Sequence, residues 1–285
     1  MNRRLRHCLL AALAPVLVAG CGPAAGASSP GPDSPVAGAG TTTSAAASTF
    51  APAATTSKAP AAVPVPVVVL DPGHNGGNAT ARSQINRLVP AGGITKPCNT
   101  VGAATDAGYP EHAFTWDVTT RVADLLRRRG ITVVLTRTDD TGVGPCVDQR
   151  AAAANAARAT LAVSIHADGA AATVRGFHVI EPALAPDGGN AAILGPSATA
   201  AADLLTAFSA ATAEPRATYP GPLVHAGLTR RNDLAGLNLA RVPALFIECG
   251  NMRNAQDAAL LADPVWRARA AQGVADGVLA YVGRA

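Results

Sequence analysis

The chain has 285 residues and a formal charge of +4, but three of its basic residues lie within the first six positions. Without residues 1–20, the chain holds 20 basic and 19 acidic side chains, so its net charge is only +1. This near balance gives no electrostatic basis for binding nucleic acid. The low aromatic content of 4% and the abundant alanine indicate a small-residue α/β protein, long enough to bury a core without help from metal or disulfides.

Residues 1–21 have the three parts of a secretory signal. A basic segment that ends at Arg6 precedes the apolar stretch Leu9 to Val18, and small residues follow before Cys21. Small residues directly before a cysteine resemble a bacterial lipoprotein processing site, so Cys21 is the candidate lipidation site. A plain secretion signal that contains a cysteine is the alternative. No other apolar run is long enough to span a bilayer. We therefore expect an exported, cell-envelope protein whose only membrane attachment is an N-terminal lipid on the outer face of the plasma membrane.

Residues 22–63 are mainly Ala, Pro, Ser, Thr and Gly, and only two of them are charged. Such a segment cannot bury enough apolar surface to offset the entropy lost on ordering. We interpret it as a disordered linker that precedes a single folded domain at residues 64–285.

The folded region alternates short apolar runs with segments of helical periodicity. Strands are predicted at 65–70, 131–137, 161–166, 176–180 and 243–249, and helices at 110–129, 146–159, 191–213 and 264–282. This alternation predicts an α/β fold: one domain with a mostly parallel twisted sheet and helices on both faces. Residues 78–110 are polar and rich in Gly, Pro and Asn, so we expect a long surface loop there, of the kind that often serves a function.

Two of the five cysteines are expected to form a disulfide. Cys8 lies in the signal, Cys21 is the lipidation candidate, and Cys249 lies in an apolar strand, where a free thiol behaves as a small hydrophobe. Cys98 and Cys146 lie in Gly/Pro/Asn-rich segments of an exported protein, where disulfides persist. Zinc ligation by this pair is the competing interpretation, but neither residue belongs to a Cys-x-x-Cys or Cys/His cluster.

Two histidines follow two different buried strands, His74 after the strand at 65–70 and His166 after the apolar run at 161–165. In open α/β sheets, ligands bind at the carboxyl ends of the strands, so the fold brings both side chains to the same rim. One histidine at a strand end is more often a structural hydrogen-bonding group than a metal ligand. Two at one rim favour a metal site, and a carboxylate is the third ligand in many catalytic zinc sites.

The chain has only four glutamates, and they differ in their surroundings. Glu181 and Glu214 lie in polar contexts and are expected to be solvated. Glu111 lies in the first turn of a predicted helix, where the helix dipole alone favours a carboxylate. Glu248 ends a strand that is otherwise apolar, and an unpaired buried carboxylate is unfavourable. A carboxylate that handles the proton of a metal-activated water would resolve that conflict.

Four motifs in order carry a family resemblance. They are Val-Leu-Asp-Pro-Gly-His-Asn-Gly at 69–76, Glu111, Ser-Ile-His-Ala-Asp at 164–168, and Pro-Ala-Leu-Phe-Ile-Glu-Cys-Gly at 243–250. Over residues 65–283 the sequence resembles the zinc-dependent N-acetylmuramoyl-L-alanine amidase family, and most of all its actinobacterial members without a cell-wall-binding module. The resemblance implies that His74, Glu111 and His166 bind one zinc ion and that Glu248 is catalytic. It also implies hydrolysis of the amide between the lactyl group of N-acetylmuramic acid and L-alanine of the peptidoglycan stem peptide, in cell-wall turnover or remodelling.

Other residues near these motifs are candidates for supporting roles. His225 and Arg230 are candidate substrate contacts, with simple solvation as the alternative. Asp71 and Asn75 are candidates for orienting the histidines, because they adjoin His74. His112 is expected to be exposed or to support a ligand. The family's usual continuation after the catalytic strand, Gly-Phe-Leu-Ser-Asn, is Gly-Asn-Met-Arg-Asn at 250–254 in this chain, which puts the substrate preference in doubt.

Two other functions are compatible with the same residues. A zinc carboxypeptidase-like exopeptidase has similar metal ligands, but it needs an arginine and a tyrosine at a terminal carboxylate, and none of Tyr109, Tyr219 and Tyr281 is obviously placed for that. A non-catalytic peptidoglycan-binding lipoprotein would keep the fold without activity, but the presence of all four site residues argues against it. We expect a monomer that acts on peptidoglycan or muropeptides, with the missing wall-binding module favouring soluble fragments.

Overall fold

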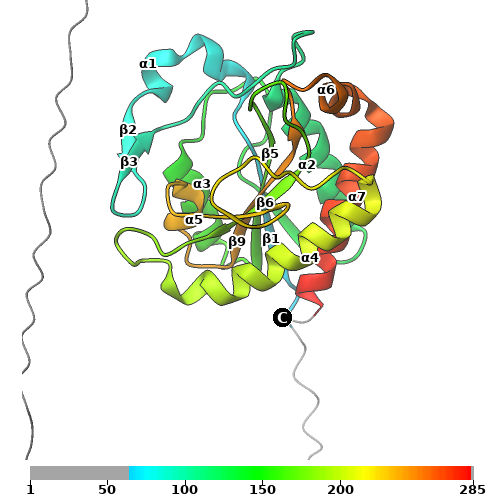
Figure 1. Ribbon diagram of the computed structural model, residues 1–285. Coiled ribbons are helices and arrows are strands. Elements are labelled where there is room, and N and C mark those ends of the chain that lie inside the picture. Colours follow the sequence, from blue (N-terminus) through cyan, green and yellow to red (C-terminus); the bar gives the residue numbers. More distant parts are fainter. Residues whose placement is uncertain (1–63, 284–285) are drawn as a thin grey trace, which may run out of the picture. The chain divides into compact units, whose positions relative to one another are not determined.

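Seven strands form one sheet within residues 64–283, the part of the chain that the computed structural model describes (Figure 1). Their order across the sheet is β4-β1-β5-β9-β6-β8-β7. The strands are β1 Val67–Pro72, β4 Thr132–Leu135, β5 Leu161–Asp168, β6 His178–Pro182, β7 Leu223–His225, β8 Leu228–Arg231 and β9 Ala244–Asn251. The predicted signal at 1–21, with Cys21, and the predicted linker at 22–63 lie outside the described residues.

The sheet has a parallel part and a mixed part. Strands β4, β1, β5 and β9 run parallel to one another. Strand β6 is antiparallel to β9 and parallel to β8, and β7 closes the edge as an antiparallel partner of β8. The prediction of a mostly parallel sheet is confirmed. The β7–β8 hairpin was not predicted, because strands of three and four residues with polar members carry no periodic signal.

Helices cover both faces of the sheet, as predicted. On one face α2 Glu111–Arg127, α4 Leu194–Thr212 and α7 Pro264–Val282 bury their apolar sides in the main core. On the other face α3 Val147–Ala156 and the short α5 Ala235–Asn238 cover smaller clusters. Successive side chains of strand β1 point to opposite faces of the sheet. Val68 and Leu70 join the main core, while Val69 packs with α3.

Helix α4, with the turn before it, has the length and composition of a membrane span. The stretch Ala191–Thr212 has a mean hydropathy of 1.3 over its most apolar window, although the sequence had suggested no such run beyond the N-terminus. Its buried side chains lie in the main core instead. Gly273 and Gly277 of α7 let the two helices approach closely, because a Cβ on Gly277 would lie 2.7 Å from the Cα of Leu204. This packing is that of a core helix.

The segment 78–110 is more ordered than the predicted surface loop. It contains most of the 3-10 helix η1 Gly76–Thr80, helix α1 Arg82–Ile85 and a two-stranded ribbon formed by β2 Leu88–Pro90 and β3 Thr95–Pro97. The predicted disulfide is confirmed: Cys98 is bonded to Cys146, 48 residues away, and both are buried beside Val89. The elements are too short to leave a period in the sequence, and their order depends on these distant contacts. The remaining short elements are η2 Ala191–Ile193 and α6 Ala255–Ala262.

Candidate metal centre

His74, Glu111 and His166 come together at the carboxyl ends of β1 and β5. One ligand atom from each lies within 4.8 Å of the others. Nε2 of His74 and Nδ1 of His166 lie 3.0 and 2.9 Å from Oε1 of Glu111, and the two imidazole rings meet edge to face at 4.9 Å. Two imidazole nitrogens and one carboxylate, open to a cleft of about 560 Å³, form a three-donor set that suits a divalent cation.

The backbone at Gly73 and His74 allows the two imidazole rings to lie this close together. His74 has a φ of 61°, in the left-handed region that non-glycine residues rarely adopt. A Cβ on Gly73 would lie 2.3 Å from the ring of His166, so only glycine fits between the strand end and that imidazole. The Pro-Gly-His sequence at 72–74 therefore does more than form a turn, because it lets the two histidine rings lie close together.

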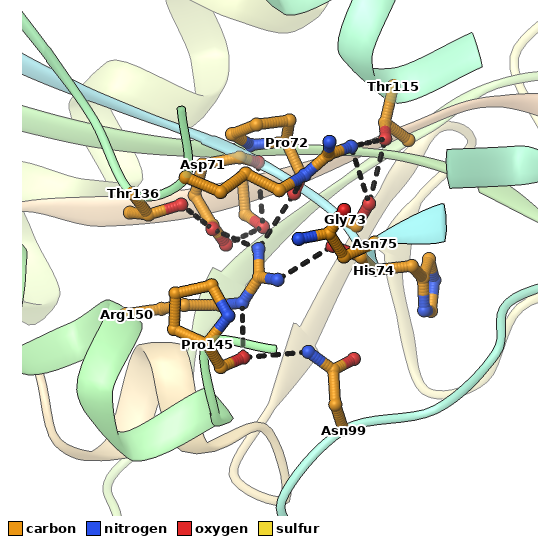
Figure 2. Close-up of polar contacts among 12 residues, drawn as sticks. Asp71, Pro72, Gly73, His74, Asn75, Asn99, Thr115, Thr136, Pro145 and Arg150 are labelled. Atoms are coloured by element: carbon orange, nitrogen blue, oxygen red, sulfur yellow. Dashed lines mark hydrogen bonds and ion pairs between the residues drawn. The ribbon is translucent and has the colours of Figure 1, made fainter. Parts of the chain in front are cut away.

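The loop that carries His74 is held by Arg150 of α3 (Figure 2). Its guanidinium donates from Nη1 to Oδ1 of Asp71 and to the carbonyl oxygen of Pro72, and from Nη2 to the carbonyl oxygen of His74, each at 2.7 Å. A second arginine, Arg137, donates from Nε to the same Pro72 carbonyl oxygen at 3.0 Å. Together these side chains satisfy backbone acceptors that a tight buried loop leaves without partners.

Asp71 acts on this loop through Arg150, not on an imidazole. Its carboxylate accepts hydrogen bonds from the hydroxyls of Thr136 and Ser164 as well as from Arg150. Burial by itself raises the pKa of a carboxyl, but Arg150 and the two hydroxyls outweigh it and lower the pKa of Asp71 to about 2. The expectation that Asp71 orients a histidine ring is therefore wrong in its detail, since the contact is with the loop backbone.

Thr100 orients the ring of His74, a role that the sequence did not indicate. Nδ1 of His74 lies 3.1 Å from both the carbonyl oxygen and the hydroxyl of Thr100. A proton on Nδ1 donated to that carbonyl leaves Nε2 bare and aimed at Glu111. Asn75, the other predicted candidate, instead donates to the carbonyl oxygen of Gly144 and accepts from the amide of Gly76. Thr100 lies in the irregular segment at 98–110, which has no period to reveal it.

Glu111, the first residue of α2, accepts hydrogen bonds from two backbone amides of other segments. Oε2 accepts from the amide of Ala103 at 2.7 Å, and Oε1 accepts from the amide of Ala167 at 3.2 Å. Burial opposes its charge, but the facing imidazoles of His74 and His166 hold the pKa of Glu111 well below the ordinary value. Its position is therefore set by the protein before any ligand binds.

The ring of His166 and the carboxylate of Glu248 stand next to each other on the sheet. The two residues are paired across the parallel strands β5 and β9, and the His166 ring stacks on Phe246 at 5.4 Å. Burial, followed by the carboxylates of Glu111 and Asp168, raises the pKa of Glu248 well above its ordinary value. Oε2 of Glu248 has no hydrogen-bond partner among residues 64–283. All four predicted site residues thus line one cleft.

The two tentative substrate contacts do not lie in this cleft. His225 is exposed on β7, and its Nδ1 lies 3.2 Å from the carbonyl oxygen of Ala226. Arg230 is exposed on β8, forms an ion pair with Glu181 and lines a different cavity. His112, in contrast, does support the site loops, since its Nδ1 lies 2.9 Å from Oδ2 of Asp140.

The prediction that Glu181 and Glu214 are solvated is wrong. Their exposed fractions are only 2% and 5%. Glu181 pairs with Arg230, and Glu214 lies 2.8 Å from the guanidinium of Arg175. Each arginine comes from a segment at least 39 residues away, so the local sequence does not show the pairing.

The departure from the family pattern at 250–254 lies outside the metal cleft. Asn251 and Met252 are fully buried, and none of the five residues lines the metal cleft. The amide of Met252 donates to the carbonyl oxygen of Asp168 at 2.7 Å, and the side chain of Asn251 donates to the carbonyl oxygens of Ala171 and Val174. This segment supports the loop after β5.

The fold and the site together define an α/β protein with a His-Glu-His centre open to a cleft, a carboxylate beside it and an arginine-held loop. The sequence pattern of the N-acetylmuramoyl-L-alanine amidase family matches residues 68–280, and the chain belongs to this family. The resemblance of the four motifs is thereby confirmed.

Known relatives agree with this assignment. The chain is 43% identical over 219 residues to an N-acetylmuramoyl-L-alanine amidase of Mycobacterium tuberculosis, covering 76% of this chain and 86% of that protein. The solved amidase structure from Mycobacterium smegmatis is 45% identical with a TM-score of 0.71, covering 77% and 98% of the two chains. The amidase from Mycobacterium abscessus is 44% identical with a TM-score of 0.70, covering 76% and 98%. These matches confirm the predicted fold class.

Proposed function

We propose that this protein is an exported zinc-dependent N-acetylmuramoyl-L-alanine amidase, acting in the cell envelope on the amide between the lactyl group of N-acetylmuramic acid and L-alanine. The observation that carries the proposal is the convergence of His74, Glu111 and His166 with Glu248 in one cleft of a chain that belongs to this family. Its substrate is peptidoglycan or a soluble muropeptide, and its role is wall turnover or remodelling.

The donor set fits one zinc ion. Three donor atoms converge here: Nε2 of His74, Nδ1 of His166 and a carboxylate oxygen of Glu111. The surrounding residues hold these side chains in place and leave the site open to the cleft. Gly102, with a φ of +89°, leaves room at this point, because a Cβ there would lie 2.9 Å from both Glu111 and the His74 ring. Zinc bound here supplies Lewis-acid chemistry, which makes a water nucleophilic near neutral pH and polarises the scissile carbonyl.

Glu248 carries the proton. The attacking water gives a proton to Oε2 as its oxygen bonds to the lactyl carbonyl carbon, and the same carboxyl then donates that proton to the alanine nitrogen as the C–N bond breaks. The products are a lactyl carboxylate and a peptide with a free amine. A carboxyl whose pKa is raised by burial and by neighbouring carboxylates is suited to hold the proton between the two steps.

The exopeptidase alternative has less support. It requires an arginine that is available for a terminal carboxylate. The two arginines that line a cavity together with Tyr219 are Arg230 and Arg231, and they are already paired with Glu181 and Asp233 respectively. A non-catalytic role would be supported by the loss of a site residue, but all four line the cleft.

The decisive experiment compares wild type with Glu248→Gln on a defined muramyl-tripeptide, with products identified by mass spectrometry. We expect wild type to release the intact tripeptide and to stop when a chelator is added. We expect Glu248→Gln to bind zinc, as measured by metal analysis, but to release no peptide. His225→Gln, outside the cleft, is the control with wild-type activity. Full cleavage by a zinc-loaded Glu248→Gln variant would overturn the role of Glu248, and chelator-resistant cleavage by wild type would overturn the role of the metal.

A further inference from the structure

The edge of the sheet opposite the metal centre carries a cluster of arginines. His74 and His166 lie at the carboxyl ends of β1 and β5, so the amino ends of these parallel strands form the other edge of the sheet. Five exposed arginines precede β4, β5 and β9 at this edge: Arg127, Arg128, Arg129, Arg158 and Arg241. We call this set the amino-edge arginines. None of them has a part in the metal centre or in the proposed mechanism.

The segments that carry these arginines lie side by side. The amide of Thr160, just before β5, donates to the carbonyl oxygen of Val67 at the start of β1, at 2.7 Å. The side chain of Asn155 in α3 accepts from the amide of Arg241, before β9, also at 2.7 Å. Neighbouring strands lie about 4.8 Å apart, so β4 and β9 are separated by about 15 Å across β1 and β5. The amino-edge arginines therefore form one patch.

Acidic side chains offset only part of this charge. Asp124, one turn earlier in α2, lies 3.8 Å from the guanidinium of Arg127. Asp187 lies two residues from Gly189, whose carbonyl oxygen accepts from Arg241 at 3.4 Å. The amino-edge arginines other than Arg127 form no ion pair with any of residues 64–283. Because the chain beyond residue 20 has a net charge of only +1, the patch is a local excess of positive charge that the rest of the surface balances.

The chain enters the folded domain at this same edge. Pro66 lies directly before β1, and its carbonyl oxygen accepts from the amide of Thr132 at the start of β4, at 3.1 Å. Residues 1–63, with the predicted signal and the candidate lipidation site Cys21, therefore join the domain beside the amino-edge arginines. This is the side of the sheet away from the metal cleft.

The chemistry of the patch suits a surface of anionic lipid headgroups. Guanidinium groups bind phosphate oxygens through paired N–H donors, and each arginine close to an anionic membrane strengthens binding about fivefold. A protein partner is less well matched, because protein interfaces have an apolar or aromatic core. Val65 is the one exposed large apolar side chain in the described segments 64–66, 127–131, 157–160 and 239–243.

We propose that the amino-edge arginines dock the domain on the anionic lipid headgroups of the outer leaflet of the plasma membrane. The docked domain turns its metal cleft away from the membrane, because the cleft lies at the opposite edge of the sheet. This contact is additional to the N-terminal lipid expected from the sequence. It goes beyond the proposed amidase function and does not depend on it, since lipid binding and hydrolysis use different residues.

Vesicle flotation tests the contact with a chain that starts at residue 22, without the predicted signal and Cys21. All hydrophobic clusters and the disulfide lie within residues 64–283, so this chain keeps the whole core. At low ionic strength it should float with vesicles of phosphatidylcholine and phosphatidylglycerol, but not with phosphatidylcholine alone. In about 1 M salt, which screens charges beyond about 3 Å, it should not float. The triple variant Arg128→Gln, Arg129→Gln, Arg158→Gln should bind about 100-fold more weakly.

A matched control removes the same charge from other parts of the surface. The triple variant Arg82→Gln, Arg253→Gln, Arg269→Gln also loses three positive charges, from α1, from the turn after β9 and from the second turn of α7. It should bind within about threefold of the unsubstituted chain, and thermal unfolding should show that both variants are folded. Equal losses in the two variants would overturn the patch, because net charge alone would then explain the binding.

Two further measurements address the partner and the orientation. Soluble poly(glycerol phosphate) is the competing anionic partner, and arginine-dependent binding of this polymer without any vesicle binding would overturn the membrane assignment. Hydrogen exchange on vesicles should show protection of the segments 127–131 and 157–160, with no change at 99–106 beside the metal cleft. Protection at 99–106 without protection at the arginine segments would overturn the proposed orientation.

Discussion

The functional side chains of the parallel part of the sheet and those at its junction with the mixed part differ in how fully they are hydrogen-bonded. In the parallel part, Arg150 and Thr100 hold His74, and two backbone amides hold Glu111. At the junction with the mixed part, Glu248 and His178 each keep a buried polar atom without a partner. The groups that would bind the metal are fixed in advance, whereas Glu248, the proposed acid/base, keeps Oε2 without a partner among residues 64–283. Preorganised ligands and available acid/base groups are what metal-assisted hydrolysis requires.

Removing the arginine that holds the His74 loop should have the largest effect. Arg150→Met leaves Asp71 buried without its cation, and we expect the free energy of unfolding to fall by about 3–5 kcal/mol. Urea unfolding measures this. Arg253→Met is the control, because its pair with Asp106 is exposed on both sides and its loss should change stability by no more than about 0.5 kcal/mol. Equal effects of the two substitutions would show that the loop is not held as described.

The disulfide ties the segment that carries Thr100 to the start of α3. Replacing both Cys98 and Cys146 by serine should lower the free energy of unfolding by about 2–4 kcal/mol, since the bond closes a loop of 48 residues. The comparison is with the wild-type protein under reducing conditions, which should show the same loss in thermal or urea unfolding. A double variant as stable as the oxidised protein would mean that the segment is held by other contacts alone.

Low pH should reduce the free energy of unfolding, because Asp71 in the parallel part of the sheet becomes protonated. Its pKa is about 2 in the folded protein against an ordinary value of 3.8, so the unfolded chain binds more protons in this interval. The contribution of Asp71 to stability, about 2 kcal/mol, is complete above about pH 4 and is lost as the pH falls to about 2. Wild type should therefore lose more stability than Asp71→Asn between pH 5 and pH 2, as measured by denaturant unfolding. Parallel pH curves for the two proteins would contradict this assignment.

The smallest effect is expected from removing one polar group that orients the His74 imidazole. Thr100→Val removes the hydroxyl beside Nδ1 of His74 and should reduce zinc affinity about tenfold with little change in stability. Competition with a chelator measures the affinity. Thr206→Val, at an exposed position of α4, should leave the affinity unchanged. An unchanged affinity in Thr100→Val would assign the orientation of the ring to the Thr100 carbonyl alone.

The sequence by itself determined the fold class and, through the family resemblance, the four residues of the candidate centre. Apolar strands alternate with helices, and His74, His166 and Glu248 lie within or just beyond such strands, where topology dictates a shared rim. These are local patterns, and a single sequence records them. The pairing of Cys98 with Cys146 followed from compartment and elimination rather than from geometry.

Only the tertiary structure decided how the site is held and what surrounds it. Arg150 and Thr100 act through partners 76 to 79 and 26 residues away in sequence, and such contacts leave no period along the chain. The burial of Glu181 and Glu214 depends in the same way on distant arginines. A strand or helix can be predicted from its own residues, but a buried polar contact exists only once the fold brings both partners together.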